Sequence, residues 1–145
     1  MKILSSVLLV ALATALAALN RPAPAAEAKV DFVKQIKPIL ESACINCHNS
    51  ENLFGNLNLE NRSRAFGKRK EGAVIIPGAP EKSPLYVVLT LPPKKTKKAM
   101  PPTGHRIEKN QLELIRAWIE QGAAWPEGKA GAIKPGPKPS SNKGS

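Results

Sequence analysis

The stretch ACINCHNS, residues 43–50, holds both cysteines of this 145-residue chain and one of its two histidines. Cys44, Cys47 and His48 have the spacing C-x-x-C-H, in which two thiols bond to a haem and the histidine binds its iron. The same side chains could instead contribute to a zinc site or form a redox-active disulfide. The remainder of the chain has to distinguish these three chemistries.

The composition indicates a small core that needs such a site. Aromatic residues make up 4% of the chain, against 10 glycines and 14 prolines. The length suits one modest domain, and a small domain with few large apolar side chains commonly depends on a disulfide, a metal or a cofactor. The pair Cys44 and Cys47 is the only place in the sequence for such a link.

Residues 1–25 have the pattern of an export signal. Lys2 precedes the apolar run Ile3–Leu19, and small residues lead to a cleavage point near Ala26. An uncleaved membrane anchor is the alternative, because this run is near the shortest length, about 17 residues, that spans a bilayer. We therefore expect the chain from residue 27 onward to be periplasmic or otherwise extracytoplasmic, with membrane contact only if the segment stays uncleaved.

The charge of the chain indicates the kind of partner. Its formal net charge is +11, and removal of Lys2 and Arg21 with the leader leaves +9. Outside the cytoplasm, a basic protein meets acidic protein surfaces or anionic membranes rather than nucleic acid. Residues 127–145 are mostly Gly, Lys, Pro, Ser and Ala, a composition that predicts a disordered basic tail. The folded haem-domain candidate is then residues 30–126.

Three segments of this unit are predicted to be helical. In DFVKQIKPILESACINCH, residues 31–48, the apolar spacing is helical, and Pro38 places the regular start near Lys37, directly before the cysteines. Ser83 and Pro84 suit the N-cap and first position of a second helix. The third, EKNQLELIRAWIEQG at residues 108–122, has one apolar face and ends at Gly122.

The fold class expected from these elements is all-α. Leu57 and Leu59 alternate with polar residues, which predicts one short extended piece, but no set of strands adds up to a sheet.

Haem is the interpretation that the surrounding sequence favours for the opening stretch. Zinc needs four nitrogen or sulfur ligands, and His105 is the only further one in the sequence. A thiol–disulfide site would sit at a helix N-terminus after a strand, whereas these cysteines follow a helix. A plain structural disulfide leaves His48 unexplained. The export signal also fits, because haem is attached to such proteins after export.

Met100 is the candidate for the sixth ligand of the iron. It lies in KKAMPPTGH, where Pro101 and Pro102 restrict the backbone, and the only other methionine is the initiator. The alternatives are a packing methionine and ligation by His105. Methionine raises the reduction potential relative to a second histidine, so the choice bears on function.

The folded unit resembles the planctomycete-type cytochrome c domain, a c-type haem module. The resemblance rests on IKPILESACINCH, the Leu57-x-Leu59 piece, VIIPGAPEKSPLY, AMPP and LELIRAWIEQGAAWP, in the order of the family. It implies a small cytochrome c-like helical domain wrapped around one covalently attached haem, with thioethers at Cys44 and Cys47. His48 and Met100 would be the proximal and distal iron ligands. It also implies that Trp118 and the Gly122-Ala123 turn belong to a C-terminal helix packed near the haem.

The function expected from residues and resemblance is that of an exported monohaem electron carrier rather than an enzyme. The alternatives are a haem protein with an open or labile sixth site, acting as a small-ligand sensor or peroxidase-like module, and a haem-free disulfide protein. Four lysines beside Met100 are either a docking site for an acidic redox partner or a solvated loop. They are Lys94, Lys95, Lys97 and Lys98.

Overall fold

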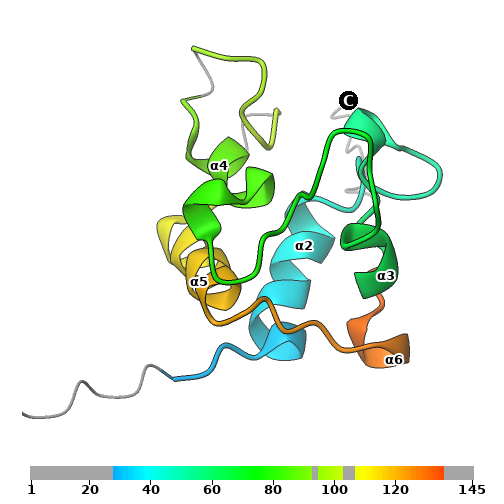
Figure 1. Ribbon diagram of the computed structural model, residues 1–145, viewed down its shortest axis with the longest axis vertical. Helices are drawn as coiled ribbons and strands as arrows, with labels where there is room; N and C mark the ends of the chain where they lie inside the picture. Colours follow the sequence, from blue (N-terminus) through cyan, green and yellow to red (C-terminus); the bar gives the residue numbers. More distant parts are fainter. Residues whose placement is uncertain (1–27, 93–94, 103–106, 136–145) are drawn as a thin grey trace, which may run out of the picture.

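The computed structural model describes residues 28–92, 95–102 and 107–135, and these residues form helices and loops. Within those ranges there is no strand, only an isolated bridge between His48 and Leu53, so the all-α class is confirmed. No described helix is long and apolar enough to cross a membrane. The elements are the π-helical turn η2 (Phe32–Ile36), α2 (Lys37–Ala43), η3 (Phe54–Asn56), α3 (Arg62–Ala65), η4 (Pro80–Lys82), α4 (Pro84–Thr90), α5 (Lys109–Glu120) and α6 (Gly128–Gly131) (Figure 1).

Several expectations lie outside the described residues. These are the export signal at 1–25, Lys94, His105 and the last part of the tail, 136–145.

Helix α2 begins at Lys37 with Pro38 in its first turn, as predicted. The chain is already helical before it, because η2 is capped by Asp31, whose side chain accepts from the amide of Lys34 (3.0 Å). Pro38 has no N–H to donate. It follows the wider turn of η2 and stands in the first turn of α2, where a helix needs no backbone N–H donor. Together the two elements bury one face, made of Phe32, Ile36, Ile39 and Leu40.

Helix α4 starts at Pro84 after Ser83, as predicted, but Ser83 does not cap it through its side chain. Ser83 is fully buried. Its hydroxyl accepts from the amide of Ile76 (2.8 Å) and donates to the carbonyl of Ala79 (3.0 Å). A buried hydroxyl takes the nearest backbone partners, so Ser83 fastens the preceding loop to the start of α4.

Helix α5 buries the predicted face, with Ile115, Trp118 and Ile119 almost wholly inside. It ends in a Schellman motif, where the amide of Gly122 donates to Ile119 O (3.0 Å) and that of Ala123 to Trp118 O (2.8 Å). Gly122 has φ +98°, a left-handed conformation that glycine adopts without steric cost.

Part of the core is a cluster of aromatic side chains. Phe32 stacks on Trp125 with ring centroids 4.5 Å apart, and Trp118 lies 5.9 Å from Phe32. Each indole N–H has a backbone acceptor, Ala124 O for Trp118 (2.8 Å) and Gly131 O for Trp125 (2.7 Å). The indoles are therefore buried without an unsatisfied donor, which favours a unique packing.

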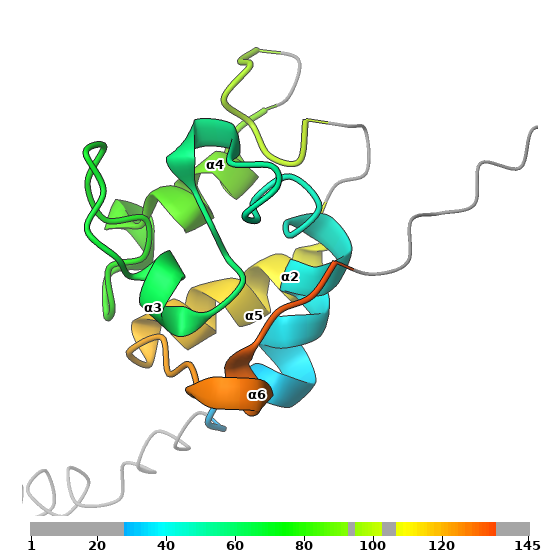
Figure 2. The same cartoon turned by 90° about the vertical axis from the view of Figure 1, so that its right-hand side faces the viewer.

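Residues 127–135 differ from the expected disordered tail, because they fold back onto the domain. α6 lies at the end of the molecule opposite the loops 44–57 and 92–102 (Figures 1 and 2). Ile133 is buried, and its amide donates to Glu60 O (2.8 Å). The composition of this segment is that of a tail. It is held on the domain because Ile133 is buried and the carbonyl of Gly131 accepts from the Trp125 indole.

Gly131 provides the first prediction, because a side chain has no room there. A Cβ at this position would lie 1.7 Å from the carbonyl oxygen of Pro126 and 2.9 Å from Cδ1 of Trp125. Gly131→Ala is expected to lower the free energy of unfolding by about 1–3 kcal/mol, the usual cost of forcing atoms into a packed core. Thermal unfolding followed by circular dichroism measures this.

The control for Gly131→Ala is Lys129→Ala, an exposed substitution on the same short helix. It should leave the melting temperature close to that of the wild type. A wild-type melting temperature for Gly131→Ala would show that α6 is not packed as described.

Candidate functional site

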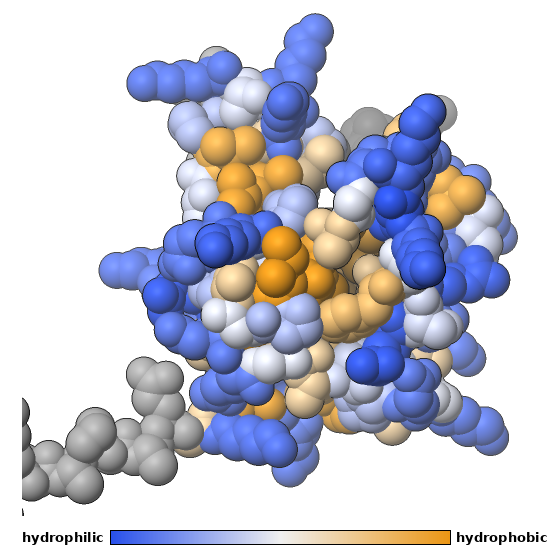
Figure 3. All heavy atoms as spheres, in the orientation of Figure 1, coloured by the Kyte–Doolittle hydropathy of each residue, from blue (hydrophilic) through white to orange (hydrophobic). Residues whose placement is uncertain are grey.

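A cavity of about 440 Å³ lies between the end of α2, the η3 turn, α4 and the segment 100–102. Figure 3 shows apolar side chains in the middle of the face seen in Figure 1 and over α4, with hydrophilic ones around them. The volume falls within the range of about 300–1,000 Å³ typical of cofactor and ligand pockets. Five of the lining residues carry a sulfur, an imidazole or a charge, namely Cys44, Cys47, His48, Arg69 and Met100.

The cysteine stretch reaches this cavity because the chain continues as a tight turn after α2. The amide of Ile45 donates to Leu40 O (3.0 Å), that of Cys47 to Cys44 O (3.2 Å) and that of His48 to Ile45 O (3.3 Å). Ile45 is fully buried and anchors the turn in the core. Both cysteines and His48 are thereby left to line one cavity, the arrangement that C-x-x-C-H spacing predicts.

The two sulfurs differ in environment, although both are free thiols. Cys44 is half-buried and Cys47 is exposed. Burial, together with the smaller effect of the neighbouring Cys47, raises the pKa of the Cys44 thiol to about 12. Cys44 is therefore a neutral thiol at pH 7, and its S–H is available to add to a double bond.

The imidazole of His48 is oriented by a backbone carbonyl. Nδ1 lies 3.0 Å from the carbonyl oxygen of Phe54, which can only accept, so this nitrogen carries the proton and Nε2 keeps its lone pair. Burial lowers the pKa of His48; the Phe54 hydrogen bond opposes this and the positive charge of Arg69 adds to it. His48 is thus the neutral imidazole with one free nitrogen that ligates metals.

Asn49 fixes the backbone just after His48, and sequence reasoning did not single it out. It is buried, its Nδ2 donates to Ile45 O (2.6 Å), and its Oδ1 accepts from the amides of Glu51 and Asn52 (2.8 Å each). The residue type was a signal in the sequence, since asparagine commonly makes such turns. Which carbonyl its side chain binds, Ile45 O, depends on the folded turn.

Met100 lines the same cavity as His48 and both cysteines, although it lies far from them in the sequence. Its backbone is held against α4, because its amide donates to Val88 O (2.9 Å). The side chain is half-buried, and Pro101 and Pro102 line the cavity next to it. Its competitor His105 lies outside the described residues.

The remaining wall is apolar and comes from α4 and the loops, not from α5. Leu57, Leu59, Val74, Leu85, Val88 and Leu89 line it. Trp118, which the resemblance placed in a C-terminal helix near the haem, is not among the lining residues. Its indole instead packs on Phe32 and Trp125, because the face of α5 that holds Trp118 is turned toward η2 and the aromatic core.

Arg69 is the functional candidate that sequence reasoning missed. Among the described residues that line the cavity it is the one with a permanent charge, and its side chain is 13% exposed. In the sequence it stands in a basic run, Lys68-Arg69-Lys70, which is typical of a solvated loop.

The lysine segment follows α4 and leads to Met100. Lys95, Lys97 and Lys98 are exposed, whereas Ala99 is buried and anchors the segment. The charges are therefore directed to solvent directly before the methionine that lines the cavity.

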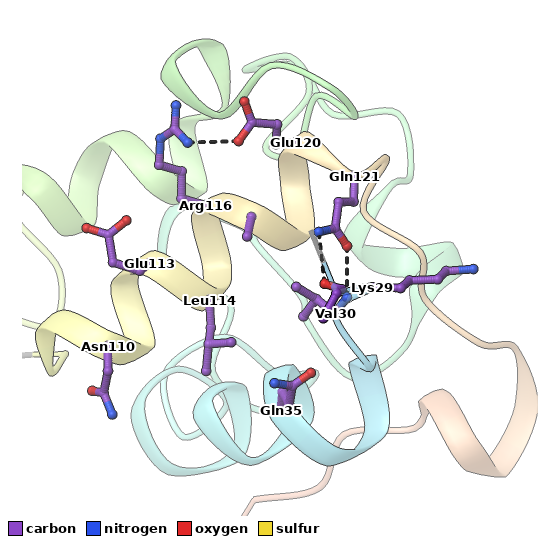
Figure 4. A pocket seen from close by; sticks show the side chains of 11 residues that line it. Lys29, Val30, Gln35, Asn110, Glu113, Leu114, Arg116, Glu120 and Gln121 are labelled. Atoms are coloured by element: carbon purple, nitrogen blue, oxygen red, sulfur yellow. Dashed lines mark hydrogen bonds and ion pairs between the residues drawn. The ribbon is translucent and has the colours of Figure 1, made fainter. Parts of the chain in front are cut away.

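A second hollow, of about 610 Å³, lies between α5 and residues 28–30 and is of a different kind. Figure 4 shows the Gln121 amide paired with this segment, donating to Ala28 O (3.3 Å) and accepting from Val30 N (2.8 Å). Arg116 there pairs with Glu120 (2.8 Å). Seven of its eleven lining residues are polar or charged, and none of the predicted site residues is among them.

The residues of the first cavity fit a covalently bound haem. Two thiols, an imidazole with a free Nε2 and a thioether surround one apolar space, which is the donor set of a c-type haem with two axial ligands. A protein-only zinc site fits less well, because among residues 28–92, 95–102 and 107–135 no three His, Cys, Asp or Glu side chains group as metal ligands.

Comparison with known proteins agrees with this donor set. No curated protein and no solved structure matches the chain. A family model does match, that of planctomycete cytochrome C, and the matched segment begins at Cys44 and ends just beyond Met100. The resemblance predicted from the motifs is therefore confirmed: residues 44–104 of this chain match the planctomycete cytochrome C family.

Proposed function

We propose that this chain is an exported c-type cytochrome that carries single electrons on one covalent haem. The observation that supports it most is that Cys44, Cys47, His48 and Met100 line a single apolar cavity, within the segment that matches a cytochrome family. Sequence motifs alone predicted each residue, and their shared cavity supports a common ligand for all four.

Each residue then has a defined role. A bound haem supplies the redox chemistry, because its iron alternates between the ferric and ferrous states. The thiols of Cys44 and Cys47 would hold the haem through thioether bonds. Nε2 of His48 and the sulfur of Met100 would bind its iron, and the apolar wall would exclude water from them.

Ligation of the iron by both His48 and Met100 would also distinguish an electron carrier from an enzyme. When a thioether occupies the sixth position, no position remains for a substrate, and the protein only sets the potential and the access of partners. If Met100 were off the iron, the same cavity would suit a small-ligand sensor or a peroxidase-like module.

The decisive experiment is spectroscopy of the protein purified from a host that exports it and attaches haem. Haem should remain with the polypeptide after denaturation and acid extraction, and the ferric protein should show the weak far-red band of methionine–iron charge transfer. A high-spin ferric spectrum would instead favour the open-site alternative. A colourless protein with a Cys44–Cys47 disulfide would rule out both haem functions.

The proposed location is the periplasm or another extracytoplasmic compartment. It is supported by the leader-like residues 1–25 and by the need for haem attachment after export. Cell fractionation and the mass of the mature N-terminus test it, and they also show whether the segment stays as a membrane anchor.

The proposed partner is a redox protein with an acidic surface, which meets the lysines Lys94, Lys95, Lys97 and Lys98. Reversing all four to glutamate is expected to slow oxidation by a small anionic oxidant such as ferricyanide by about 10-fold or more, because steering by charge changes on-rates by about 10–10³. The salt dependence of the rate should change sign as well. Stopped-flow kinetics at several ionic strengths measures both.

A control with the same change in net charge distinguishes local steering from overall charge. Four exposed lysines outside the 94–98 segment are reversed instead, namely Lys29, Lys34, Lys129 and Lys134. An equal effect of both sets would show that the 94–98 segment is a solvated loop and not a docking site.

A further inference from the structure

The guanidinium of Arg69 joins two turns at the wall of the cavity. Its Nε donates to Asn56 O (3.0 Å), its Nη2 to Gly55 O and its Nη1 to Gly72 O (3.5 Å). Three nitrogens of one planar fork therefore hold backbone carbonyls from both turns, which a lysine ammonium cannot reproduce.

Apart from Arg69, the η3 turn is tied by its backbone, because the amide of Phe54 donates to Cys47 O (3.3 Å) and that of Asn56 to Leu53 O (2.9 Å). None of its three residues is buried, so its own side chains do not fasten it to the core. Gly55 and Asn56 both have left-handed φ angles, +62° and +54°, a conformation that is uncommon for a residue other than glycine. Asn56 is also tied to Glu71, its Nδ2 donating to Oε1 (2.8 Å), and Glu71 lies 3.7 Å from Arg69 Nη2.

The same turn carries the acceptor for His48. Phe54, the first residue of η3, receives the Nδ1 proton of the imidazole at 3.0 Å, and its neighbours Gly55 and Asn56 are the two residues whose carbonyls Arg69 binds. If these carbonyls were released, the backbone of the turn could rotate and the Phe54 oxygen would lose its alignment with the imidazole.

We infer that Arg69 is a positioning residue for His48: its fork holds the η3 turn so that the Phe54 carbonyl keeps the imidazole oriented, with Nε2 directed to the cofactor. This inference rests on the proposed function, because it assigns Arg69 a role in setting the electronic properties of a haem ligand. The charge of Arg69 alone would stabilise the reduced state, so the fork and the charge have to be separated by experiment.

Arg69→Lys separates them, because it keeps the charge and removes the fork. In the reduced holo-protein, NMR measures the exchange of the His48 Nδ1 proton with water. We expect exchange about 10-fold faster in Arg69→Lys, as for the loss of a typical hydrogen bond to a charged group. The reduction potential should rise, since an imidazole without its acceptor donates less to ferric iron.

Two controls distinguish local from general effects. The amide of Trp118 in the core should exchange at the wild-type rate in Arg69→Lys, which excludes global destabilisation. Arg64→Lys, at an exposed arginine that pairs with Glu60 (3.4 Å), should change neither the exchange of the His48 proton nor the potential.

The outcomes distinguish this inference from the proposed function. A wild-type rate and potential in Arg69→Lys, together with a lowered potential in Arg69→Gln, would mean that Arg69 acts through its charge alone and would overturn the inference. A wild-type protein without covalent haem would overturn the proposed function, and the inference with it.

Discussion

Replacement of Cys44 and Cys47 together by alanine is expected to abolish covalent haem binding completely. Both sulfurs line the cavity, and the sequence has no other cysteine that could form a thioether. Haem staining of a denaturing gel, which detects only attached haem, should show no band. The protein should also unfold at a lower temperature, because a tightly bound cofactor stabilises the folded state and a small core depends on it.

Asn46→Ala is the matched control for the cysteine pair. Asn46 is exposed and stands between the two cysteines, so the substitution changes the motif region without removing a sulfur. Its haem staining should equal that of the wild type. Retained staining in the double cysteine variant would contradict thioether attachment at these positions and, with it, the central element of the proposed function.

Met100→Ala is expected to have the second largest effect, on the iron rather than on attachment. The haem should stay covalently bound, while the far-red band disappears and the reduction potential falls by on the order of 0.1 V, within the span of about 0.8 V that axial ligands control. The fall follows because a thioether favours ferrous iron. Spectroelectrochemistry measures both quantities. Met100→His should remain low-spin but lose the band.

The control for Met100 is Leu57→Ala, which removes a half-buried apolar side chain from the same cavity. Its far-red band should persist, because no donor is lost. A band that persists in Met100→Ala would instead show that Met100 only packs in the cavity, and His105 would become the ligand to test.

Much of the helical structure could be predicted because its signals are local. Pro38 marks the start of α2, Pro84 that of α4, and Gly122 ends α5 through a Schellman motif; each acts within one turn of its own backbone. The apolar face of α5 follows from spacing alone. At residues 127–135, which fold back onto the domain, two distant partners decide the structure, Gly131 O for Trp125 and Glu60 O for Ile133.

The sequence by itself determined that Cys44, Cys47 and His48 have the spacing of a haem attachment motif, because that spacing is set within a single turn of backbone. It also indicated Met100, through its rarity and its prolines. Only the tertiary structure decided that these four line one cavity, that Phe54 holds the His48 proton and that Arg69 holds Phe54's turn. Those relations join segments that are separate in the chain, and a carbonyl or an arginine has no local pattern that reveals which distant atom it will meet.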